Sequence, residues 1–159
     1  MTGIVSFATD NEYCSQRADL DFWWPKIAIV LEKHNLSGAD NRDRAECGDN
    51  PTYPVFLVND LVIKFFGHMS NWENAFNSER RAHKFLMKDT TILAPEILGE
   101  GQLFEESEAP WPYIISTRVA GKAWLNKKHA QSRYFSGESS MLQACLGFKH
   151  SFRLFYLFK

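Results

Sequence analysis

The sequence predicts one α+β domain, in which a small antiparallel sheet carries a packed helix and is preceded by an N-terminal helix. Three observations indicate this class. Two segments repeat their apolar residues at helical spacing, one pair of short apolar runs is separated by only two residues, and two further runs of strand length follow. The order is helix, hairpin, helix and two strands, at residues 21–34, 53–66, 72–87, 95–99 and 111–116. The 159 residues are 45% apolar and 23% charged, which favours a globular chain with a core over wholesale disorder.

The first predicted helix runs from Asp21 to His34. Asp21 can serve as its N-cap, and Pro25 is tolerated in a first turn. The turn formers at 35–38 end the helix. Its apolar residues recur near helical spacing at Phe22, Trp23, Ile27, Val30 and Leu31. Residues 1–20 are polar and mixed, and we expect them to form an N-terminal extension without a defined element.

A hairpin is predicted next. The polar segment 40–49 is a weak candidate for an edge strand, and a cluster of turn formers stands at 48–51. The apolar runs 53–58 and 61–66 then form two strands. The residues between them, Asn-Asp at 59–60, are typical of a tight turn, so the two strands are expected to pair antiparallel.

The second predicted helix spans 72–87. The side chains expected to face the sheet are Phe76, Ala82, His83, Leu86 and Met87. Glu79 lies on a neighbouring face, so its carboxylate can point toward the hairpin. The last two strands, 95–99 and 111–116, lie around the acidic loop 105–108.

The charge balance changes abruptly along the chain. Residues 1–117 carry 10 Lys/Arg against 18 Asp/Glu, whereas residues 118–159 carry 8 against 1. Such a break is typical of a basic binding tail or of a segment that does not belong to the preceding fold. We therefore divide the chain into the extension 1–20, a lobe at 21–121, and a basic aromatic tail of irregular or helical structure at 122–159.

Other sequence features favour a soluble, cytoplasmic protein. No apolar stretch reaches the ~20 residues that a transmembrane helix needs, and the amino terminus lacks the basic start of a secretory signal. Cys14, Cys47 and Cys145 are widely spaced without the pairing of a zinc site, so we expect reduced thiols and no metal ligands. Packing, rather than ligand binding, is expected for the large aromatic residues Trp23, Trp24, Trp111 and Phe76.

Lys64 and Glu79 carry the clearest chemical signal. Lys64 closes an apolar strand, and Glu79 follows 15 positions later on the predicted helix. A strand lysine oriented by a helix carboxylate can hold the phosphates of a nucleoside triphosphate if a loop with closely approaching amides lies beside it. Residues 48–53 are the candidate loop. The simpler alternatives are a solvated strand end, an exposed helical pair of Glu79 with Arg80 or His83, and an ordinary turn.

Five short segments share an order and spacing with a known group of enzymes. They are Gly48–Tyr53, Leu61–Phe65, Ser78–Glu79, Ala94–Gly99 and Tyr113–Gly121. Through these segments the chain resembles the aminoglycoside phosphotransferase and choline kinase superfamily, the small-molecule relatives of protein kinases. The resemblance runs from about Asp21 to Trp124, and it implies a protein-kinase-like amino-terminal lobe that binds ATP.

The resemblance also implies roles for individual residues. Lys64 would contact ATP phosphates and Glu79 would pair with it. The loop around the phosphates would include Gly48, Asn50 and Thr52. The hinge, the segment that binds adenine through backbone hydrogen bonds, would include Ser116, Arg118 and Val119.

The chain departs from the superfamily in its second half. Members continue into a helical lobe with a catalytic-loop Asp, an Asn and a metal-binding Asp, but this chain has no aspartate beyond Asp89. His150 has no acid beside it, so no catalytic residue is assigned, and magnesium is expected only if a catalytic lobe is supplied. We expect a truncated ATP-dependent small-molecule phosphotransferase, in which the tail replaces the second lobe through truncation, an alternative exon or a shifted frame.

Three alternatives stay open. The chain could be a non-catalytic, pseudokinase-like module or inactive isoform that binds a protein partner through the exposed lobe face or the aromatic tail. It could also be an unstable truncated product. The tail combines cations with aromatic rings, a composition that serves nucleic-acid or anionic-membrane binding as well, although we expect neither of these partners.

Overall fold

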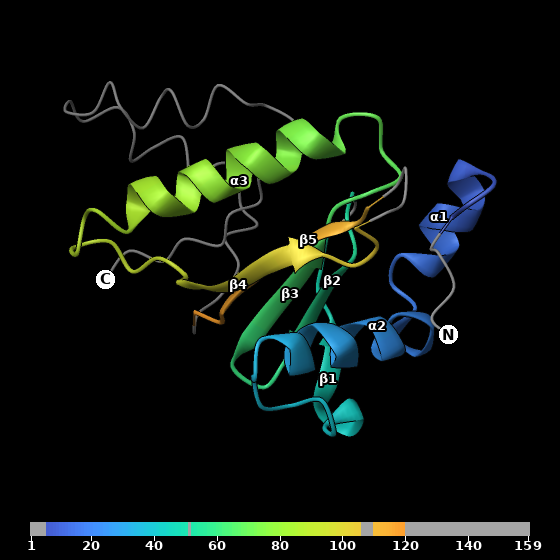
Figure 1. Ribbon diagram of the computed structural model, residues 1–159, viewed down its shortest axis with the longest axis horizontal. Coiled ribbons are helices and arrows are strands. Elements are labelled where there is room, and N and C mark those ends of the chain that lie inside the picture. The colour runs from blue at the N-terminus through green and yellow to red at the C-terminus, as the bar shows by residue number, and fades with distance from the viewer. Residues whose placement is uncertain (1–5, 51, 106–109, 120–159) are drawn as a thin grey trace, which may run out of the picture.

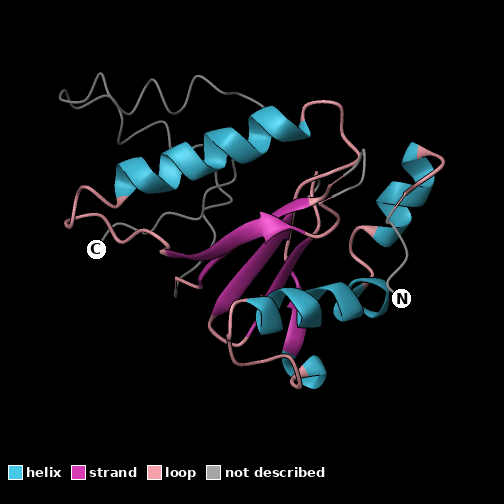
Figure 2. Ribbon diagram, in the orientation of Figure 1, coloured by secondary structure: helices cyan, strands magenta, loops and turns pink. Residues whose placement is uncertain are grey.

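The computed structural model describes residues 6–50, 52–105 and 110–119 (Figure 1). Within these ranges it has an α+β fold, in which two helices lie on opposite faces of a five-stranded antiparallel sheet (Figure 2). The predicted fold class is confirmed. The elements are α1 (Asp10–Gln16), α2 (Leu20–Lys33), the 3-10 helix η1 (Arg42–Arg44), β1 (Ala45–Cys47), β2 (Val55–Val58), β3 (Leu61–Phe65), α3 (Trp72–Leu86), β4 (Ile97–Gln102) and β5 (Pro112–Thr117). The predicted tail at 122–159 lies outside the described residues.

The strand order is β1-β2-β3-β5-β4, and all neighbours are antiparallel. β2 and β3 form the predicted hairpin, with Val58 paired to Leu61. Asn59 in the turn adopts a φ of 52°, a left-handed conformation that asparagine accepts at little cost. β5 lies between β3 and β4, so it is an interior strand, and its residues 112–116 are all buried.

α2 covers one face of the sheet with an aromatic core. Trp23 is fully buried and stacks on Phe65 of β3, with ring centroids 4.9 Å apart. The ring of Trp111 belongs to the same cluster, with its centroid 5.2 Å from that of Trp23. The predicted packing role of these two tryptophans is confirmed. Other buried members of this cluster are Ile27, Val30, Leu31, Phe56, Ile63, Tyr113 and Ile115.

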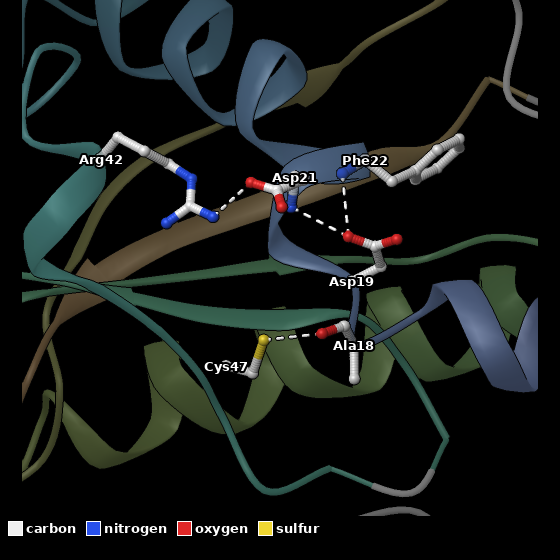
Figure 3. A network of polar contacts seen from close by, with 6 residues as sticks. All are labelled: Ala18, Asp19, Asp21, Phe22, Arg42 and Cys47. Atoms are coloured by element: carbon white, nitrogen blue, oxygen red, sulfur yellow. Dashed lines mark hydrogen bonds and ion pairs between the residues drawn. The ribbon is translucent and has the colours of Figure 1, made fainter.

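α2 begins one residue earlier than predicted, and its N-cap is Asp19 rather than Asp21 (Figure 3). The Asp19 carboxylate accepts hydrogen bonds from the amides of Asp21, at 2.9 Å, and of the following residue, at 3.1 Å. Asp21 instead accepts from Arg42 of η1 at 2.5 Å. The Cys47 thiol donates to the carbonyl of Ala18 at 2.8 Å, so the start of α2 is tied to edge strand β1.

α3 lies across the opposite face of the sheet (Figure 1). Phe66 is fully buried there, and its ring contacts those of Phe76 on α3 and Tyr53, with centroids 5.3 and 5.1 Å apart. The buried residues of α3 are Ala75 and His83. His83 therefore faces inward as predicted, and Phe76 packs half-buried against the same cluster.

Three local expectations were wrong. Met87 was predicted to face the sheet, but it is 48% exposed because α3 ends one residue before it. Pro25 lies in the second turn of α2 because that helix begins early. β4 covers residues 97–102, three beyond its predicted end. The longer strand pairs Gly101 with Tyr113 of β5, where an added Cβ would be only 2.6 Å from the hydroxyl oxygen.

α1 forms in the predicted extension, where no element was expected. The Thr9 side chain caps it by accepting from the amide of Glu12 at 3.2 Å. Phe7 and Tyr13 are buried in the same aromatic cluster as Trp23. A helix of 7 residues is too short for its apolar periodicity to be recognised, because only one or two positions face the core.

Candidate functional site

Lys64 and Glu79 meet on the α3 face of the sheet. Lys64 stands in β3 between Ile63 and Phe65, which are buried against α2, so strand alternation directs its side chain to the other face. Glu79 projects from α3 toward it. Lys64 Nζ lies 2.5 Å from Glu79 Oε2, and each side chain is 12% exposed. The two residues paired from the sequence are therefore in direct contact and largely shielded from water.

Two aromatic rings enclose the ammonium group of Lys64. Its Nζ lies 4.9 Å from the ring centroid of Phe66 and 5.5 Å from that of Tyr53, and ring faces attract cations. Burial, with a smaller contribution from the Glu79 carboxylate, raises the pKa of Tyr53. Its hydroxyl therefore keeps its proton and donates to Asn71 Oδ1 at 3.3 Å. A carboxylate and two rings thus fix the position of the lysine.

A second ion pair sets the position of α3. Arg80 binds both carboxylate oxygens of Glu100 on β4, with Nε 2.5 Å from Oε2. A two-point contact of this kind restricts orientation as well as distance. Arg80 directly follows Glu79 in α3, so the contact restrains rotation of the helix and keeps Glu79 toward β3. The hydrogen bonds from Arg80 lower the pKa of Glu100, which favours the charged carboxylate.

The connection between β1 and β2 reaches the ion pair through Tyr53. At its start the Gly48 amide donates to the Val55 carbonyl at 2.7 Å, and an added Cβ would lie 2.6 Å from Val55 Cγ1, so the approach requires glycine. Asn50 Oδ1 accepts from the amides of Thr52, at 2.8 Å, and of Tyr53, at 2.9 Å. Two backbone amides therefore converge on a single oxygen atom in the loop whose Tyr53 ring lies against Lys64.

A strip of side chains lies next to Lys64 on the same sheet face. Leu57, Val62 and Ser116 stand opposite one another on β2, β3 and β5. Positions two residues apart along a strand share a face and lie about 7 Å apart, so this strip runs parallel to the row that contains Lys64. Leu57 and Val62 are half-buried and Ser116 is buried. The α3 face thus places a mainly apolar strip beside a cation.

The other predicted hinge residues follow β5 and are arranged differently from Ser116. The Arg118 amide donates to the carbonyl of Asp60 at 2.6 Å, and its guanidinium lies 3.5 Å from the Glu46 carboxylate on β1. Arg118 is therefore engaged with neighbouring strands through both its backbone and its side chain. Val119 is half-buried and continues the chain beyond it. The hinge roles of Ser116, Arg118 and Val119 stay predictions.

Three residues at the site were not singled out from the sequence. Phe66 could have been identified from the sequence, because it follows Lys64 by two positions at the end of the apolar run 61–66, and residues two apart in an extended chain share a face. No sequence feature pointed to Asn71 or Tyr13. The Tyr13 hydroxyl donates to the carbonyl of Thr52 at 2.5 Å across 39 positions of sequence, a contact that arises only when α1 folds against the sheet.

The described part of the chain has neither a cluster of metal ligands nor a helix suited to a membrane. No three His, Cys, Asp or Glu side chains of these residues gather as metal ligands. No helix of the same residues combines the length and apolarity that crossing a bilayer requires. The expectation that magnesium binds only with a catalytic lobe stays a prediction.

No protein-family model matches the chain. Among solved structures, the chain is similar to the GDP and kanamycin complex of APH(2'')-IIIa, an aminoglycoside phosphotransferase. The alignment has 18% sequence identity and a TM-score of 0.47. It covers 62% of this chain and 31% of that chain, so the match concerns only part of the larger protein.

Proposed function

We propose that the described residues form the ATP-binding part of a small-molecule phosphotransferase of the aminoglycoside phosphotransferase type. The observation that carries this proposal is the contact between Lys64 and Glu79, with 2.5 Å between Nζ and Oε2. A nucleoside triphosphate concentrates negative charge, and a cation that is oriented in advance binds it with a smaller loss of conformational freedom. In this proposal Lys64 binds phosphate oxygens while Glu79 holds it in place.

The sheet surface beside the pair supports the same proposal. A purine base needs an apolar surface, and a mainly apolar strip of Leu57, Val62 and Ser116 runs about 7 Å from the row of Lys64. A base on this strip, with Val119 at its edge, would direct the phosphates toward the ammonium. Pocket walls that are mainly apolar with a few polar groups are typical of cofactor sites.

The loop before β2 would complete the phosphate site. Gly48 lets the backbone turn closely at its start, and the amides of Thr52 and Tyr53 converge on Asn50 Oδ1. Converging amides of this kind bind anions, so a phosphate oxygen could replace the Asn50 oxygen as their acceptor. Asn50 would then hold the empty loop in a shape close to that of the bound state.

We expect nucleotide binding without phosphoryl transfer by this chain alone. Kinases use aspartates to accept the proton of the attacking hydroxyl and to bind magnesium. No aspartate follows Asp89 in the sequence, and the residues assigned here bind and orient the nucleotide only.

A second candidate function is a non-catalytic module that binds a protein partner. The contacts of Asn50 favour it, because the amides of Thr52 and Tyr53 are satisfied without any anion. Such a module would have no affinity for ATP that depends on Lys64. The two functions therefore differ in whether the affinity for ATP depends on Lys64.

Calorimetric titration of the full chain with ATP, with and without magnesium, tests the proposal. Lys64→Ala should weaken binding about tenfold or more, because hydrogen bonds to charged groups contribute roughly 1.5–3 kcal/mol. The matched control is Lys33→Ala. Lys33 also pairs with a glutamate, Glu105, at 2.9 Å, but this pair is exposed and its lysine lies on α2. We expect the control to bind ATP like the unaltered protein.

Two outcomes would contradict the proposal. An unaltered protein that releases no heat with ATP, or equal affinities for Lys64→Ala and Lys33→Ala, would favour the non-catalytic module. Unfolding curves of both variants show whether they are folded under the titration conditions. Phosphate transfer by the purified chain, abolished in Lys64→Ala, would instead overturn the expectation of no turnover.

A further inference from the structure

α1 lies outside the lobe predicted from the sequence, yet it contacts the loop before β2. The Tyr13 hydroxyl donates to the Thr52 carbonyl at 2.5 Å. Tyr13 is 2% exposed, and burial is the main cause that raises its pKa. The hydroxyl is therefore protonated at neutral pH and acts as the donor. This contact joins the amino-terminal helix to the residue that precedes Tyr53.

The segment Thr52–Tyr53 is held on several sides. Asn50 Oδ1 accepts from both of its amides, and Tyr13 binds the carbonyl of Thr52. The Tyr53 ring packs on Phe66, with centroids 5.1 Å apart. The Tyr53 hydroxyl donates to Asn71 at the start of α3, and the Tyr13 contact ties the same segment to α1.

α1 is itself fixed to the chain that leaves β3. The Tyr13 ring stacks on His68 with centroids 4.4 Å apart, and Asp10 lies 2.9 Å from His68 Nε2. The Phe7 ring meets Tyr13 edge-on at 5.3 Å and also lies 5.8 Å from Trp111. The hydroxyl of Tyr13 therefore projects from a packed aromatic cluster, and its position is set by the core.

We propose that Tyr13 is a positioning residue for the nucleotide site, through which α1 holds the Thr52–Tyr53 segment beside Lys64. The inference rests on the proposed function for its nucleotide part. In this arrangement the hydroxyl fixes the Thr52 carbonyl. The two amides then point at Asn50 Oδ1 and the Tyr53 ring lies against Lys64 in one conformation, so binding requires less ordering of the loop. Residues before the predicted lobe thereby contribute to affinity without touching the ligand.

Tyr13→Phe tests the inference in the full chain, because it removes the hydroxyl and keeps the packed ring. The matched control is Tyr113→Phe. The Tyr113 hydroxyl is also buried and has one described partner, His34 Nε2 at 3.1 Å, but it lies in the α2-side cluster away from the loop. Two readouts are needed, namely hydrogen exchange of the Thr52 and Tyr53 amides without ligand and ATP affinity by calorimetry.

We expect Tyr13→Phe to speed exchange at both amides about fivefold and to weaken ATP binding by a similar factor, as loss of one neutral hydrogen bond allows. Tyr113→Phe should change neither quantity. Unchanged exchange in Tyr13→Phe, or faster exchange with unchanged ATP affinity, would overturn the inference while the proposed function stands. If the unaltered protein binds no ATP, the proposed function and the nucleotide part of the inference both fall. The exchange rates still decide whether Tyr13 holds the loop.

Discussion

Glu100→Gln should lower the free energy of unfolding by about 1.5 kcal/mol at pH 7. The substitution keeps the size of the side chain but removes the charge that binds both nitrogens of Arg80. A hydrogen bond to a charged group contributes roughly 1.5–3 kcal/mol, and a two-point contact lies toward the upper part of that range. The side chains of Arg80 and Glu100 are 30% and 34% exposed, so water screens the pair and the lower end applies.

The pH dependence of this difference has a defined sign. Because hydrogen bonds from Arg80 lower the pKa of Glu100 in the folded state, the unfolded state binds its proton more readily. The stabilisation is fully present above the unfolded pKa, roughly 4.3, and is lost as the pH falls through the lower folded value. The gap between the unaltered protein and Glu100→Gln should therefore be constant from pH 6 to 8 and shrink below about pH 4.

Urea denaturation at several pH values measures the difference in unfolding free energy between the unaltered protein and Glu100→Gln. Glu105→Gln is the matched control, because Glu105 also pairs with a cation, Lys33, but its side chain is 67% exposed. Its effect should stay within about 0.5 kcal/mol. Equal effects of the two substitutions at pH 7, or a Glu100→Gln effect that persists unchanged at pH 3, would refute the assignment of Arg80–Glu100 as the contact that holds α3.

Two further predictions concern the core and the loop. Trp23→Ala should lower the unfolding free energy by about 3–5 kcal/mol because Trp23 is fully buried. Trp24→Ala, at a half-buried neighbouring position, should lower it by about 1 kcal/mol. Similar losses for the two variants in denaturation curves would contradict the assigned core. Gly48→Ala should destabilise by about 1–3 kcal/mol because its Cβ would lie 2.6 Å from Val55 Cγ1. Adding Val55→Ala removes that atom, so the double variant should lose less than the sum of the two single effects, and simple additivity would argue against the close approach.

The elements that the sequence predicted well are those with a local signal. The hairpin at residues 53–66 follows from two apolar runs separated by a two-residue turn, and α2 and α3 follow from apolar periodicity. Boundaries were less accurate, because a cap depends on which side chain reaches the free amides. Asp19 and Asp21 are both good N-caps by type, and only the folded chain selects Asp19.

In the candidate site, too, some contacts could be predicted from the sequence and others could not. The pairing of Lys64 with Glu79 was predictable because each position sits on a regular element whose period sets the direction of its side chain. The engagement of Arg118 with Asp60 and Glu46 was not, because these residues come from three separate parts of the chain. Asn50 lies in the connection between β1 and β2, but no local pattern indicated that its side chain accepts from the amides of Thr52 and Tyr53.

The fold class, the hairpin and the pairing of a strand lysine with a helix carboxylate could all be predicted from the sequence, because all three depend on spacing within or between adjacent elements. Three features became visible only in the folded chain. β5 lies between β3 and β4, Arg80 donates hydrogen bonds to Glu100, and the Tyr13 hydroxyl donates to Thr52. These contacts join segments that are distant in sequence or whose relative placement no local pattern sets. They form only when the burial of one shared core brings the segments together.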